Sequence, residues 1–165
     1  MMPLLRMSAV LIATLAVVPA MAEPTGCDHF KWPLDHEKAL LSKPIAVASG
    51  GAATLATGET LTLDPEATAK LPQAPSRPPK FPGSYAGFVT LAAPASAGIY
   101  RVTLTRGAWI DVVQDGHLLK TVDHTGATGC AGLAKSVKFD LKATPFTVEI
   151  SSSTAPSVAL VVTPD

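Results

Sequence analysis

Four histidines are the side chains in this sequence best suited to binding a metal: His29, His36, His117 and His124. A non-haem iron oxygenase needs two histidines and one carboxylate on one side of the metal. His29 and His36 lie in an N-terminal arm, whereas His117 and His124 would point to opposite faces of one continuous strand. Because no His-x-His or His-x-x-Glu pair occurs, the sequence predicts no metal site and no cofactor.

Trp109 and Asp111 lie in one apolar run, residues 109–113. Residues two apart in a strand point to the same face, so the indole and the carboxylate share a face. A carboxylate among apolar neighbours needs a partner, for which Lys135 is a candidate. Two interpretations stay open. One is a structural ion pair, and the other is a small-ligand pocket of Trp109, Asp111, Lys135 and His124, because an indole beside charged groups can bind a sugar or an amine.

Catalytic motifs of other kinds are absent from the sequence. It contains no Gly-x-Ser-x-Gly, no glycine-rich phosphate loop and no His-Glu-x-x-His. Glycoside hydrolysis would need a pair of acids, but Asp115 is a turn residue, and Asp140 and Glu149 fall on strand faces that we expect to be exposed. No catalytic residue is therefore predicted.

Cys27 and Cys130 are the two cysteines of the chain. In an exported protein an even number of cysteines favours complete pairing, so we expect a disulfide that closes a loop of about 100 residues. The competing interpretation is a reactive thiolate, with His29 or His124 as its base. The disulfide would attach the N-terminal arm to the rest of the domain.

Export is predicted by residues 1–22. A positively charged start, a run of 12 uncharged apolar residues from Met7 to Val18, and Ala20-Met21-Ala22 have the form of a cleaved signal peptide. We expect cleavage after Ala22 and a periplasmic or secreted mature protein. The apolar run is shorter than the roughly 20 residues that cross a bilayer, so no membrane span is expected.

Composition limits the fold and the partners. The chain has 165 residues, enough for one domain, and its 13 basic and 13 acidic residues give a formal net charge of zero. Without a field of one sign we expect no binding to nucleic acid. Only 5% of residues are aromatic, and 15 prolines with 12 glycines favour short strands over helical bundles.

Residues 23–43 are expected to form the N-terminal arm. Helix-forming residues over 34–43, with Asp35 as the cap, predict one short helix that ends before Pro44. Phe30 and Trp32, close to Cys27, are expected to cover an edge or end of the sheets as a plug. The alternative for Trp32 is an exposed aromatic platform for a ligand.

Alternation of apolar and polar residues predicts strands throughout the domain, residues 44–165. The predicted strands are 45–49, 60–63, 88–91, 100–105, 108–114, 117–122, 136–141, 146–151 and 158–163. Asp115-Gly116 is typical of a two-residue hairpin turn. Six prolines between Asp64 and Gly83 exclude a regular element there, and we expect this segment to cross from one sheet to another. The predicted fold is all-β: an antiparallel sandwich or jelly roll of about eight strands with one short N-terminal helix.

Two resemblances accompany these patterns. Residues 97–104, Ala-Gly-Ile-Tyr-Arg-Val-Thr-Leu, resemble the Gly-x-Tyr strand entry of prepeptidase-C-terminal-type β-sandwich modules. Residues 27–33, 108–112 and 130–137 together resemble a family of small exported proteobacterial proteins, some of which carry the name homogentisate 1,2-dioxygenase. The resemblance implies an exported β-sandwich, and the name implies a non-haem iron enzyme.

We therefore expect an exported, non-enzymatic β-sandwich. Its partner would be a small molecule, a glycan or an envelope protein, or it would have a structural role in the envelope. The alternative is a metal-dependent enzyme of the homogentisate 1,2-dioxygenase type, or a hydrolase.

Overall fold

The computed structural model describes residues 25–165. The predicted signal peptide and its cleavage site lie outside the described residues. Within this range the chain forms twelve strands, one short α-helix and one 3-10 turn. Neither helical element is long and apolar enough to cross a membrane.

The first sheet has the strand order β1-β3-β12-β6-β10-β9. In that order the strands are Ile45–Val47, Glu59–Thr62, Ser157–Pro164, Gly98–Leu104, Lys135–Leu141 and Thr121–Gly126. The pair β1 and β3 is parallel, whereas the other neighbours are antiparallel.

The second sheet has the order β2-β5-β11-β7-β8, and β4 also pairs with β5. The strands β2, β5, β11, β7, β8 and β4 are Ala52–Ala53, Tyr85–Leu91, Phe146–Ser153, Trp109–Gln114, His117–Leu118 and Asp64–Pro65. Because β2 runs parallel to β5, both sheets are mixed and not purely antiparallel.

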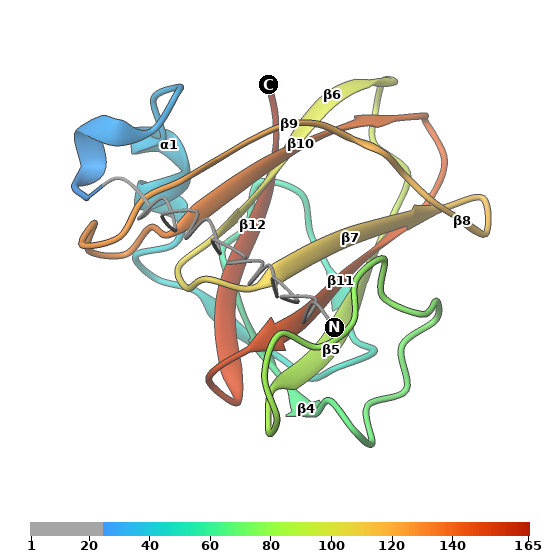
Figure 1. The fold of residues 1–165 in the computed structure, drawn as a ribbon. Helices are drawn as coiled ribbons and strands as arrows, with labels where there is room; N and C mark the ends of the chain where they lie inside the picture. Colours follow the sequence, from blue (N-terminus) through green and yellow to red (C-terminus); the bar gives the residue numbers. More distant parts are fainter. Residues whose placement is uncertain (1–24) are drawn as a thin grey trace, which may run out of the picture.

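The two sheets are packed in a sandwich-like arrangement around one main core (Figure 1). Every second residue of the long strands enters it, as the alternation predicted. Val102 and Leu104 of β6 and Phe139 of β10 meet Val148 and Ile150 of β11, and all five are at most 1% exposed. The residues between them therefore point to the two outer faces.

Three connections test the sequence-based expectations. The Asp115-Gly116 turn between β7 and β8 is confirmed, with both residues at positive φ. Residues 117–122 do not form one strand, because β8 belongs to the second sheet and β9 to the first. The chain also changes sheets at Leu63, between β3 and β4, so the proline-rich segment does not make the crossing and instead joins β4 to β5.

The N-terminal arm is attached to the first sheet by the predicted disulfide, Cys27–Cys130. It contains the 3-10 turn Cys27–His29 and the helix α1, Asp35–Leu40. Asp35 is the first helical residue and makes no capping hydrogen bond, so the predicted cap is wrong. Leu34, Leu41 and Leu133 form a second apolar cluster with Val161 of β12, whose side chain faces away from the main core.

Candidate functional site

The outer face of β7 and β11 carries the side chains that the sequence singled out. Ile110 and Val112 of β7 enter the main core, so Trp109 and Asp111 point outward. Across the strand pair, Asp111 lies opposite Glu149 and Trp109 opposite Ser151. Because opposite residues of paired strands share a face, an indole, two carboxylates and a hydroxyl form one group.

This group is covered by residues 66–83, the segment between β4 and β5, which we call the proline strap. Asp111 Oδ2 accepts the Ser76 amide N–H at 3.0 Å, and Oδ1 accepts the Ser76 hydroxyl at 2.5 Å. The indole N–H of Trp109 donates to Ser76 Oγ at 2.8 Å. Ser76 is therefore the centre of a connected set of hydrogen bonds between strap and sheet.

Glu149 is 1% exposed, because the strap lies over it. Its Oε1 accepts the Gln73 amide N–H at 2.8 Å, whereas its buried Oε2 has no hydrogen-bond partner among the described residues. Burial raises the pKa of this carboxyl and the Asp111 charge adds to the effect, against the lowering by the Gln73 hydrogen bond. The sequence-based prediction that Glu149 is exposed is wrong.

A third acid, Glu66, lies at the start of the strap. Its Oε2 accepts the Ser152 amide N–H at 2.9 Å and the Ser84 hydroxyl. Ser152, at positive φ where the pairing of β11 with β5 is irregular, in turn accepts the Lys80 amide N–H through its hydroxyl at 3.1 Å. Strap amides at positions 73, 76 and 80 are thus each accepted by a side chain of the sheet.

Two cations lie against the Trp109 ring. The Arg77 guanidinium carbon is 4.1 Å from the ring centroid and Lys135 Nζ is 4.8 Å from it. Lys135 Nζ also donates to the Ala108 carbonyl at 3.0 Å. The structure therefore brings Trp109, Asp111 and Lys135 into one neighbourhood. His124 is exposed on β9, an edge strand of the other sheet.

The strap contacts were not predicted from the sequence. Gln73, Ser76 and Arg77 were part of a segment expected only to connect two sheets. A usable signal was its charge, because residues 67–83 contain Lys70, Arg77 and Lys80 but no acid. A basic segment in a chain of zero net charge fits a face that carries buried carboxylates.

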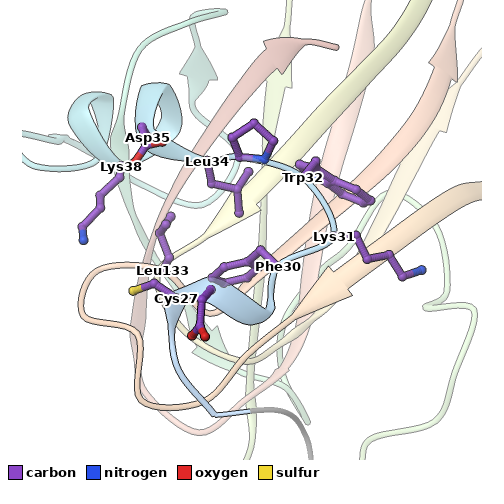
Figure 2. Close-up of a pocket in the computed structure, with 10 residues that line it drawn as sticks. Cys27, Phe30, Lys31, Trp32, Leu34, Asp35, Lys38 and Leu133 are labelled. Atoms are coloured by element: carbon purple, nitrogen blue, oxygen red, sulfur yellow. The ribbon is translucent and has the colours of Figure 1, made fainter.

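The arm contains a separate cavity of about 290 Å³ between the 3-10 turn and α1. Figure 2 shows the Phe30 ring among Leu34, Leu133 and Trp32, beside Cys27. Trp32 is half-buried, its ring centroid lies 4.3 Å from Lys138 Nζ, and its indole N–H is buried without a partner among the described residues. The arm lies on an outer face of the first sheet, and reaches its edge where Lys31 pairs with Asp123 at 2.6 Å.

Beside this cavity an ion-pair network fixes α1 to the sheet. Glu37 is 2% exposed and accepts from Arg101 at 3.3 Å and from the Thr163 hydroxyl at 2.7 Å. Lys138 and Arg101 both pair with Asp165, and the hydrogen bond from Lys138, followed by that from Arg101, holds the pKa of this carboxyl below its ordinary value. Buried charge in the arm therefore has a partner of opposite sign.

The four histidines lie apart in the structure. His29 is in the 3-10 turn, His36 in α1, His117 in β8 and His124 in β9, and all four side chains are exposed. Within residues 25–165 no three His, Cys, Asp or Glu side chains form a group that could hold a metal ion. These residues do not fit the iron site that the dioxygenase name implies.

Neither a family model, a curated protein nor a solved structure matches this chain. The two resemblances drawn from sequence motifs stay expectations.

Proposed function

We propose that this chain is an exported, non-enzymatic β-sandwich of jelly-roll type that binds a partner molecule through the outer face of β7 and β11. The observation that carries the proposal is the group of Trp109, Asp111, Glu149 and Ser151 outside the main core. Buried carboxylates without a counter-charge lower stability, because each loses its hydration. A face built only for stability would be apolar or would pair its buried charges, as the arm-covered face does with Val161 in an apolar cluster and Glu37 paired with Arg101.

The polar face is suited to binding and not to catalysis. A carboxyl of raised pKa beside a second carboxylate is the kind of pair that acid–base catalysis uses. Here, however, Asp111 and Glu149 are engaged by amide groups of the strap, and both are less than 10% exposed. The site offers aligned acceptors and an indole, which recognise N–H donors and flat or basic groups.

The disulfide supports export, since disulfides persist in oxidising compartments. Expression of the full chain followed by cell fractionation and N-terminal sequencing tests this part. We expect mature protein in the periplasmic or culture fraction beginning at Glu23. Protein retained in the cytoplasm with its first 22 residues would contradict it.

Binding is tested by a thermal-shift screen with chito-oligosaccharides, spermidine and basic proline-rich peptides as probes. We expect at least one probe to raise the melting temperature of the wild type and of Asp140→Asn, which changes an exposed residue of the first sheet. The same probe should not stabilise Asp111→Asn. Equal shifts for all three proteins would place binding elsewhere.

Stoichiometric iron in protein purified without a His tag, with turnover of homogentisate, would favour the enzyme alternative.

A further inference from the structure

The proline strap is bound to the sheet like a peptide ligand. None of residues 66–83 is buried, and none belongs to either apolar cluster. The contacts include the amide hydrogen bonds at positions 73, 76 and 80, the two hydrogen bonds of the Ser76 hydroxyl and the Arg77 contact with Trp109. The Gln73 side chain also donates to the Gly116 carbonyl at 3.3 Å, and Glu66 accepts the Ser152 amide N–H. A segment held by hydrogen bonds that water can replace, without apolar burial, opens at a low free energy.

The basic composition of the strap points to the kind of chain that fits, although Arg77 lies against the Trp109 ring and no ion pair joins the described strap cations to Asp111 or Glu149. The strap supplies three basic residues and no acid over 67–83, and the face beneath it supplies Asp111 and Glu149, with Glu66 beside them. Prolines limit the number of amides, and three of those that remain meet a side-chain acceptor on the sheet. An aromatic ring with polar acceptors is a general arrangement for recognising proline-rich segments, because such segments lose little conformational entropy on binding.

The strap also leaves part of the face unfilled. Glu149 Oε2 and Ser151 Oγ are buried, in residues only 1% and 2% exposed, and have no hydrogen-bond partner among the described residues. Both lie on the strand that pairs with β7 beside Trp109 and Asp111. A buried acceptor without a donor is unfavourable, so a ligand that supplies one further N–H donor would bind better than the strap does.

We propose that the outer face of β7 and β11 binds a proline-rich, basic segment of another protein, and that the strap is its resident and replaceable occupant. This inference rests on the proposed binding function and names its partner class. A partner segment would resemble residues 70–82 and carry an additional Lys, Arg or Asn side chain directed at Glu149 and Ser151. Because the strap is tethered beside the face, its effective concentration is high, and a competing segment must bind well to displace it.

The first experiment weakens the strap without changing the face. The variant Ser76→Ala/Arg77→Ala removes the hydroxyl hydrogen bonds and the contact with Trp109, and Lys70→Ala is the matched control on the exposed part of the strap. A labelled peptide of residues 70–82 is titrated into each protein by fluorescence anisotropy. We expect it to bind the double variant at least tenfold more tightly than the wild type or the control. Equal binding by all three proteins would overturn the proposal.

The second experiment tests the unfilled acceptors. Peptides of residues 70–82 with one Lys, Arg or Asn at each position from 71 to 77 are compared on the double variant. We expect at least one to bind tenfold more tightly than the unaltered peptide, and we expect that gain to disappear when Glu149→Gln is added. A gain that persists without the Glu149 carboxylate, or no gain at any position, would contradict the proposed partner chemistry.

Hydrogen exchange in the wild-type protein covers the case in which the double variant fails to fold. Excess peptide should increase the hydrogen-exchange rates of the Gln73 and Ser76 amides and leave the exchange rates of the β6 amides unchanged. Unaltered protection at saturating peptide would overturn the proposal.

Concentration-dependent dimers of the wild type that are lost in Ser76→Ala/Arg77→Ala would instead identify a second copy as the occupant. If a chito-oligosaccharide binds at Asp111 but no peptide does, the binding function stands and this inference fails.

Discussion

Both outer faces of the sandwich are covered by segments outside the sheets, but the two covers are held differently. The arm is joined by the Cys27–Cys130 disulfide and buries leucines against Val161. The strap has no buried residue, and carboxylates accept the amides of Gln73 and Ser76. Apolar burial and a cross-link give a permanent cover, whereas exchangeable hydrogen bonds give a cover that another chain can replace. In the function that we propose, this difference separates a structural face from a binding face.

The largest expected effect comes from releasing the arm. Cys27→Ser/Cys130→Ser removes a cross-link between residues separated by 103 positions. For a loop of that size the chain-entropy model assigns about 4.7 kcal/mol, so we expect unfolding free energy to fall by about 4 kcal/mol. Urea denaturation of variant and wild type measures it. A loss below about 1 kcal/mol would show that the arm is as weakly attached as the strap.

Truncating the arm's indole should have the next largest effect. Trp32→Ala removes a half-buried ring between the arm cluster and Lys138. Truncating a fully buried Trp or Phe to Ala lowers the free energy of unfolding by about 3–5 kcal/mol. For this half-buried ring we expect a loss of about 2–3 kcal/mol and a melting temperature lower by several degrees. Val122→Ala, at an exposed position, is the control. If Trp32→Ala melts like the control, the plug role is wrong and the arm is the first place to look for a binding site.

On the strap-covered face, loss of a single acceptor should cost less. Asp111→Ala removes both hydrogen bonds to Ser76, and we expect a loss of about 1–2 kcal/mol. Asp140→Ala changes an exposed side chain and should stay within about ±0.5 kcal/mol. Denaturation midpoints of the two variants, measured side by side, test the difference. Equal midpoints would mean that water replaces the strap contacts without cost.

The sequence predicted those features that depend on near neighbours in the chain. Period-two alternation located β6, β10 and β11, the Asp115-Gly116 dipeptide located a hairpin, and the expectation of export together with two cysteines predicted the disulfide. Two-residue strands such as β2 and β4 give no periodic signal, and parallel pairing of β1 with β3 depends on the whole sheet. Jelly-roll topology stays a prediction.

The candidate site was predicted only in part, because its cover comes from elsewhere in the chain. Trp109, Asp111 and Lys135 were recognised by residue type, and they do lie near one another. Glu149 was assigned to an exposed face, because local alternation cannot show that a segment more than 60 residues earlier lies over it. Burial of the second carboxylate is a tertiary effect that no pattern within β11 encodes.

The smallest expected effect is the change in unfolding free energy when a buried glutamate is replaced by glutamine, and its sign should differ between the two faces. Glu37, under the arm, is paired with Arg101, whereas Glu149, under the strap, accepts only the Gln73 amide and has no counter-charge in the described part of the chain. One oxygen of each carboxylate lacks a hydrogen-bond partner among the described residues. Replacing Glu37 by Gln removes a charge that stabilises the fold, so Glu37→Gln should be destabilised by about 1 kcal/mol or more at pH 7. Replacing Glu149 by Gln removes a buried charge that lacks a counter-charge, so Glu149→Gln should be stabilised by about 1 kcal/mol at pH 7.

The pH dependence distinguishes the Glu149 effect from a general change in packing. Burial raises the pKa of Glu149 above its ordinary value of 4.5, so folding favours the protonated carboxyl. The stability contributed by that form is complete below pH 4.5 and is lost as pH rises through the folded-state pKa. The advantage of Glu149→Gln over wild type should therefore be present at pH 7 and vanish below pH 4.5. Glu59, whose pKa burial also raises, is unchanged in both proteins and cancels in the difference. Melting curves of the two proteins from pH 3.5 to 7.5 measure that difference in stability. If the advantage of Glu149→Gln does not change with pH, it does not come from removing the buried negative charge of Glu149.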